Sequence, residues 1–67
     1  MPIIDVSVVE GRTEPQLRAL MSELVRAASE TLAVPAESVR VVVREVSPHH
    51  WAVGPQTYAE REAGRTA

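Results

Sequence analysis

Two short runs of aliphatic, mostly β-branched residues stand on either side of one long amphipathic segment. In the first run, Ile3–Val9, every second side chain from Ile4 is aliphatic, which is the alternation of a strand with one buried face. The second run, Val39–Val46, is nearly all valine and also favours a strand. Between the two runs, aliphatic residues recur at helical spacing from Leu17 to Leu32. The pattern predicts the order strand, helix, strand.

Local signals mark both ends of the predicted helix. Thr13 and Gln16 have the spacing of a capping box, and Pro15 lies in the first turn, where its missing N–H costs nothing. Pro35 prevents continuation, so the helix should end near Leu32. A helix of about 19 residues spans roughly 28 Å, which carries the chain back along the first strand. We therefore expect a right-handed β-α-β unit with two parallel strands.

The remainder of the chain is more polar. Residues 51–58 are expected to form a short hairpin that bends at Gly54-Pro55. The tail, 59–67, either frays or finishes as a partial helix. The predicted fold class is therefore α/β, with a short β-α-β unit and a C-terminal hairpin in one domain that spans the whole chain, 1–67.

The chain is small, with 67 residues, and it has no cysteine. A domain of this size buries only about 60% of the surface that its unfolded chain exposes, and no disulfide is present to compensate. One helix can cover only one face of a two-stranded sheet. The other face carries valines together with Arg40 and has to meet another subunit. Size and pattern both predict an oligomer.

Composition excludes several classes of function. Seven arginines and no lysine stand against nine acidic residues, for a net charge of −2. This balance argues against nucleic-acid binding and rules out Schiff-base chemistry on a lysine. No apolar run approaches the roughly 20 residues of a membrane span. The first residues also lack the pattern of a signal peptide, so a cytoplasmic protein that binds no membrane is expected.

Two arginines stand out as candidate binding residues. Arg40 interrupts the second β-branched run on the face expected to be covered, and a buried charge is costly unless it is paired. Its partner is either a carboxylate across the interface or an anionic ligand. Arg12 follows Gly11 in the loop after the first strand, where a guanidinium can grip a carboxylate through two hydrogen bonds. The simpler alternative is a surface ion pair with Glu10 or Glu14.

Three other polar residues are assigned no chemistry. His49 and His50 are adjacent in a polar turn and have no third ligand nearby, so no metal site is expected. Arg44 shares a face with Arg40 and is expected to be structural, paired with Glu45 or Glu37 of a neighbouring subunit.

Four motifs remain to be considered together: Pro2-Ile3-Ile4, Glu10-Gly11-Arg12-Thr13, Ser38-Val39-Arg40-Val41 and the aromatic Trp51. In their residues, their spacing and the length of the chain, they resemble the 4-oxalocrotonate tautomerase family. Each motif is weak by itself, and the four are strong in combination. The resemblance covers about residues 2–54. It implies a tautomerase-like fold that is completed by oligomerisation. It also implies a reaction that needs no metal or organic cofactor. Beyond Gly54 the chain departs from the family pattern through Pro55.

The resemblance also implies a role for each matching residue. Pro2, once freed by removal of Met1, would be a secondary amine that acts as the catalytic general base. Arg40 would bind the 2-oxo group with its adjacent carboxylate and stabilise charge on the enolate oxygen. Arg12 would bind the distant carboxylate. Trp51 stands where the family usually has phenylalanine, and it would form an apolar wall with a larger ring, which changes the size of the pocket.

The implied function is tautomerisation of a 2-hydroxy-dienoate such as 2-hydroxymuconate to its 2-oxo isomer. The substrate would be a small, anionic, unsaturated oxo acid, and the enzyme a homo-oligomer, expected as a hexamer built as a trimer of dimers. Two alternatives stay open. One is hydrolytic dehalogenation of an unsaturated acid, which needs a water-activating carboxylate that no residue matches. The other is a non-catalytic oligomer that binds an anion, and retention of Met1 would favour it.

Overall fold

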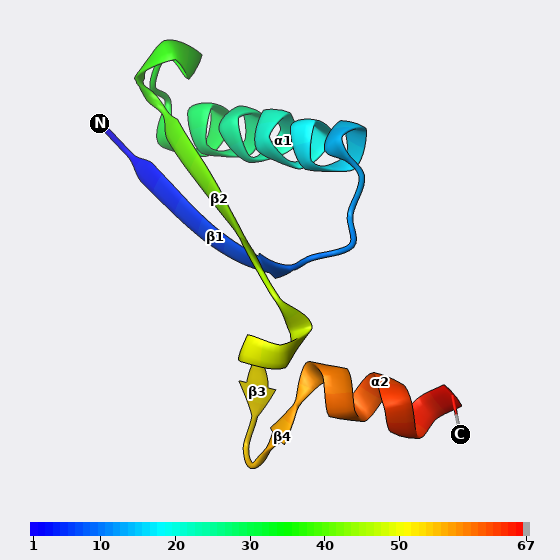
Figure 1. Ribbon diagram of the computed structural model, residues 1–67. Helices are drawn as coiled ribbons and strands as arrows, with labels where there is room; N and C mark the ends of the chain where they lie inside the picture. Colours follow the sequence, from blue (N-terminus) through cyan, green and yellow to red (C-terminus); the bar gives the residue numbers. More distant parts are fainter. Residues whose placement is uncertain (67) are drawn as a thin grey trace.

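The computed structural model describes residues 1–66 and contains the expected strand-helix-strand order followed by a small C-terminal arm (Figure 1). None of the helices in this part of the chain is long and apolar enough to cross a lipid bilayer. The elements, in chain order, are β1 (Ile3–Val9), α1 (Glu14–Leu32), the 3-10 helix η1 (Ala36–Ser38), β2 (Arg40–Val46), the 3-10 helix η2 (Pro48–His50), β3 (Ala52–Val53), β4 (Gln56–Thr57) and α2 (Tyr58–Thr66).

Strands β1 and β2 pair in parallel, and α1 covers one face of this sheet (Figure 1). The register begins with Ile3 opposite Arg40. Alternate side chains of β1 are half-buried and the ones between them are exposed, up to Val9 at the end of the strand. Leu17 and Val39 are the only buried side chains among those that the structure describes. The predicted β-α-β unit is confirmed, and its core within one chain is very small.

The ends of α1 follow the local signals in the sequence. The Thr13 hydroxyl accepts a hydrogen bond from the Gln16 N–H at 3.2 Å, and the Gln16 side chain accepts one from the Thr13 N–H at 2.9 Å. At the other end Ala33 adopts the left-handed conformation, with φ of 56°, and its N–H donates to the Ser29 carbonyl. Pro35 follows two residues later and cannot continue the helix. The capping box and the helix end are therefore both as predicted.

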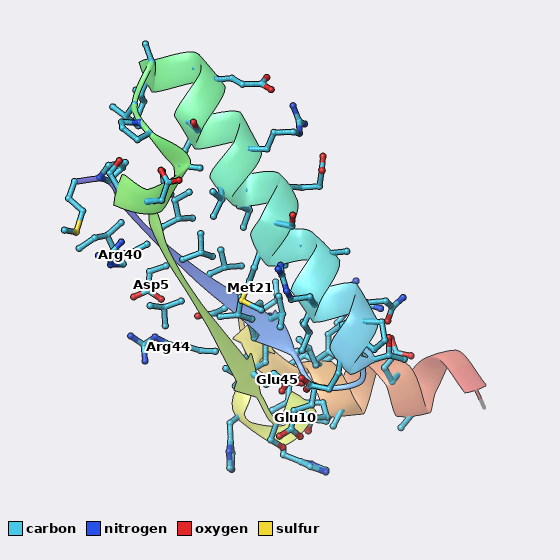
Figure 2. All side chains as sticks on the ribbon, turned by 90° about the horizontal axis from the view of Figure 1, so that it is seen from above. Asp5, Glu10, Met21, Arg40, Arg44 and Glu45 are labelled. Carbon is cyan, nitrogen blue, oxygen red and sulfur yellow. The ribbon has the colours of Figure 1, made fainter. Side chains whose placement is uncertain are left out.

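The face of the sheet that is turned away from α1 is open in the single chain (Figure 2). On this face Ile3 is 70% exposed and Val42 is 42% exposed. Arg44 pairs there with Asp5 through two hydrogen bonds of 3.1 Å, which raise the pKa of the Arg44 guanidinium. Within the chain, the carboxylate that pairs with Arg44 is thus Asp5 rather than a glutamate. The reason is the register, which sets Asp5 opposite Val42 and diagonally across from Arg44.

The C-terminal arm, residues 47–66, extends away from the β-α-β unit, so the chain is elongated, 48 × 25 × 15 Å (Figure 1). Strands β3 and β4 form the predicted hairpin, and Gly54 in its bend has a positive φ of 62°. The tail is helical rather than frayed, because α2 begins with a second capping box. Thr57 and Glu60 exchange hydrogen bonds of 2.7 and 3.1 Å there. Residue 67 of the expected tail lies outside the described residues.

Candidate active site

The parallel register brings Pro2 and Arg40 together at one end of the sheet. The Arg40 backbone N–H donates to the Pro2 carbonyl at 3.0 Å, so the proline that precedes β1 lies beside the first residue of β2. Pro2 is half-buried, and Arg40 is exposed on the open face (Figure 2). Of the four site residues that the sequence suggests, these two are neighbours within a single chain.

Arg40 has no carboxylate partner among residues 1–66. Its Nη1 instead donates to the Glu37 backbone carbonyl at 2.8 Å. A carbonyl carries no net charge, so the guanidinium keeps its positive charge and most of its donors for an anion. Arg44, on the same face, is by contrast neutralised by Asp5. Within the described chain, Arg40 is therefore the cation beside Pro2 that is free to bind an anionic ligand.

The chemistry of Pro2 depends on Met1. In the sequence with Met1 present, the Pro2 nitrogen is part of a peptide bond and is not basic. Met1 is 78% exposed, so a processing enzyme can reach it. Its removal would turn the Pro2 nitrogen into a secondary amine, and α-amino groups ordinarily titrate at about 7.7–8.0. A guanidinium close to such an amine would disfavour its charged form, which favours a base that works near neutral pH.

Arg12 and Trp51 lie at the opposite end of the sheet from Pro2. Arg12 is exposed in the loop between β1 and α1, after Gly11, whose φ of 131° most other residues avoid. Trp51 is half-buried beyond the end of β2, and its carbonyl accepts a hydrogen bond from the Tyr58 N–H at 2.7 Å. The seven residues of β1 separate the two ends of the sheet by about 23 Å. One chain therefore does not bring all four predicted residues to one substrate.

The other candidate features of the described chain lie away from this strand end. An open depression of about 200 Å³ on the surface of α1 is lined by Arg18, Met21, Ser22 and Val25, none of which was predicted to bind substrate. No three His, Cys, Asp or Glu side chains within residues 1–66 are grouped so that they could hold a metal ion. The candidate site is thus the strand end at Pro2 and not a pocket enclosed by one chain.

Two contacts near the site were not predicted from the sequence. The hydrogen bond from Arg40 to the Glu37 carbonyl involves a backbone group, which no residue pattern reveals. The ion pair between Asp5 and Arg44 has a signal in the sequence, because the alternation in the two strands places both residues on the open face. Finding that pair required the parallel register as well as the alternation.

Comparison with known proteins agrees with this fold. A family model described as tautomerase enzyme matches residues 2–61. A probable tautomerase of Ralstonia nicotianae is 49% identical over 53 residues, which are 79% of this chain and 76% of that protein. The crystal structure of TomN, a 4-oxalocrotonate tautomerase homologue in the tomaymycin biosynthetic pathway, has a TM-score of 0.90 at 47% identity and covers 92% of this chain and 95% of its own.

A heterohexameric 4-oxalocrotonate tautomerase from Chloroflexus aurantiacus has a TM-score of 0.86 at 37% identity, over 90% of this chain and 97% of its own. The family model and the relatives show that the chain belongs to the tautomerase enzyme family. Within that family it is of the 4-oxalocrotonate tautomerase type, and it is an isomerase. The resemblance seen in the four sequence motifs is thereby confirmed.

Proposed function

We propose that this isomerase converts a 2-hydroxy-dienoate such as 2-hydroxymuconate into its 2-oxo isomer, with Pro2 as the amino-terminal general base after removal of Met1. The observation that carries the proposal is the 3.0 Å hydrogen bond from the Arg40 N–H to the Pro2 carbonyl. The bond joins the backbones of Pro2 and Arg40, and the Arg40 guanidinium has no carboxylate partner in the described chain. A small, anionic, unsaturated oxo acid offers the negative charge and the acidic proton that such a pair can handle.

The proposed reaction moves one proton along a conjugated system. The neutral Pro2 amine takes the proton of the 2-hydroxyl group, the C2–O bond becomes a carbonyl, and the double bonds shift along the carbon chain. The same nitrogen, now an ammonium, delivers a proton to the vinylogous carbon and is neutral again. Arg40 stabilises the negative charge on the oxygen between the two transfers. The proton count balances without a cofactor.

The proposal needs more than one chain in each site. Arg12, which would bind the distant carboxylate, and Trp51, which would exclude water, lie one strand length from Pro2, so other copies have to supply them. Association of the same copies would also bury apolar surface that the small core of Leu17 and Val39 leaves exposed in a single chain. We propose a homo-oligomer, in particular a hexamer built as a trimer of dimers; the Chloroflexus aurantiacus relative is a heterohexamer. We place it in the cytoplasm, where new chains lose their first methionine.

Intact mass and an absorbance assay together test the proposed function. We expect a mass lower than that of the full sequence by one methionine residue, and rapid ketonisation of 2-hydroxymuconate that Arg40→Ala strongly reduces. Loss of Met1 with turnover of other unsaturated acids alone would replace the proposed substrate, and release of halide from a haloacrylate would point to dehalogenation. Retained Met1 without activity would overturn the proposal in favour of an anion-binding oligomer.

A further inference from the structure

The turn between α1 and β2 is held by a series of hydrogen bonds that begins at Ser29. The Ser29 hydroxyl donates to the Val34 carbonyl at 2.6 Å, and the Ser29 carbonyl accepts from the Val34 N–H at 3.1 Å. The first of these bonds is partly buried, so water competes for it only weakly. Ser29 therefore holds Val34 at both of its backbone polar groups and sets the direction in which the chain leaves the helix.

Hydrogen bonds also hold the second half of the turn, where the side-chain bonds are exposed. The Pro35 carbonyl accepts hydrogen bonds from both the N–H and the hydroxyl of Ser38, at 3.0 and 2.7 Å. Between Pro35 and Ser38 lies Glu37, and its carbonyl is the acceptor for the Arg40 guanidinium at 2.8 Å. The series that starts at Ser29 thus ends on the side chain that faces the anion in the proposed reaction.

We propose that Ser29 is a positioning residue for Arg40: through the turn it sets the direction of the Glu37 carbonyl and so aims the guanidinium. The Arg40 backbone is already held by the Pro2 carbonyl, so the direction of the side chain is what the turn adds. A long arginine side chain has many rotamers, and one fixed acceptor selects among them. The catalytic consequence rests on the proposed function, whereas the geometric part does not.

A simpler role for Ser29 is to satisfy a carbonyl beyond the last turn of α1, which would stabilise the helix end and nothing more. Three variants separate the two roles. Ser29→Ala removes the hydroxyl, and Ser29→Thr keeps it. Ser22→Ala makes the same change two turns earlier on α1, at an exposed serine without a side-chain hydrogen bond. Should Ser29→Ala not fold, Ser38→Ala loosens the same turn from its other end.

The first measurement is kcat and KM on 2-hydroxymuconate, in the wild-type and the Arg40→Ala backgrounds. We expect S29A to lower kcat/KM by about three- to tenfold, the range of one net hydrogen bond, with S29T recovering most of it. S22A should leave kcat/KM unchanged. In the Arg40→Ala background S29A should cause no further loss, because its effect passes through that guanidinium. An equal loss in both backgrounds would overturn the proposal.

The second measurement does not depend on activity. The ¹⁵N relaxation of the Arg40 Nε–H reports how tightly the guanidinium is held, and S29A is expected to lower its order parameter while S29T and S22A do not. An unchanged Arg40 order parameter in folded S29A protein would overturn the proposal. If wild-type protein that has lost Met1 fails to turn over 2-hydroxymuconate, the proposed function fails, and this measurement alone decides the positioning role.

Discussion

At the residue scale, the proposed reaction depends on a nitrogen that becomes basic only when Met1 is removed. The neighbouring Arg40 is a cation without a carboxylate partner in residues 1–66, whereas Arg44 on the same face is neutralised by Asp5. A cation beside an amine favours the neutral amine, which is the form that accepts a proton. The geometry therefore divides the proposed chemistry between Pro2, which carries the proton, and Arg40, which stabilises the charge.

Replacement of Pro2 by alanine tests the proton carrier. Pro2→Ala still permits removal of Met1, and it leaves a primary instead of a secondary amine. We expect turnover of 2-hydroxymuconate to fall by about ten- to a hundredfold without vanishing, because a base of altered basicity and geometry remains. Steady-state kinetics beside intact mass checks this. Full wild-type activity in a preparation that retains Met1 would contradict the role of Pro2.

Replacement of Arg40 and replacement of Arg12 should change different kinetic parameters. Arg40→Ala is expected to lower kcat by about a hundredfold, because charge that develops in the transition state loses its partner. Arg12→Ala should mainly raise KM, by about tenfold, since it removes binding that substrate and transition state share. Rates measured over a range of substrate concentrations separate the two effects. Equal, mild losses in both variants would argue against this division of roles.

At the element scale, both helices begin with a threonine that exchanges hydrogen bonds with the side chain three residues later. In α2 this partner is Glu60, and the Thr57 N–H that donates to its carboxylate at 2.7 Å holds the pKa of that carboxyl below its ordinary value of 4.5. The corresponding residue in α1, Gln16, is neutral at every pH. The capping box of α2 is therefore sensitive to acid, and the capping box of α1 has no group that titrates.

The sign of this effect follows from linkage. The pKa of Glu60 is lowered in the folded protein. The cap therefore stabilises α2 at pH values above 4.5, and this contribution is lost as the pH falls through the pKa of the folded protein. We expect the amide and Cα chemical shifts of residues 58–61 to keep their helical character down to a pH of 4.5 and to lose it as the pH falls further. Glu60→Gln, which keeps the acceptor without its charge, should remove that pH dependence. An identical acid transition in E60Q would show that another group is responsible.

At the scale of the whole molecule, the two side chains that are buried in the described part of the chain form too small a core to account for the fold by themselves. The open face of the sheet exposes Ile3 and Val42, and the C-terminal arm projects from the β-α-β unit (Figure 1). Both features expose apolar surface that partner chains would cover. Assembly would also supply the Arg12 and Trp51 that a single site lacks, so stability and catalysis should depend on the same contacts.

A charge on the open face should therefore abolish assembly and activity together. Val42→Glu would place a second carboxylate beside Asp5, its neighbour in the register, on the face that partner chains are proposed to cover, where removing a charge from water costs several kcal/mol. Sedimentation velocity should show smaller species than the wild type, and turnover of 2-hydroxymuconate should fall with them. Ala27→Glu, at an exposed position of α1, is the matched control and should change neither. A fully assembled and active V42E protein would contradict the proposed interface.

Much of the fold could be predicted from the sequence, because its signals are local. The capping box at Thr13, the stop before Pro35 and the alternation in Ile3–Val9 each act over a few neighbouring residues, and each appears in the structure as expected. The Thr57-x-x-Glu60 spacing is a signal of the same kind that was overlooked, and it would have decided between a frayed and a helical tail. The candidate site residues came from the family resemblance, and the relatives support that family.

The tertiary structure decided which of these residues meet. The sequence by itself determined the elements, their order and the residue types available for chemistry, because hydrogen bonds and side-chain sterics between near neighbours set those. Only the register of β1 against β2 placed Arg40 beside Pro2, paired Arg44 with Asp5 and left Arg12 a strand length away. Register depends on contacts between segments more than thirty residues apart. The pattern of neighbouring residues in the sequence does not show which of the possible contacts forms.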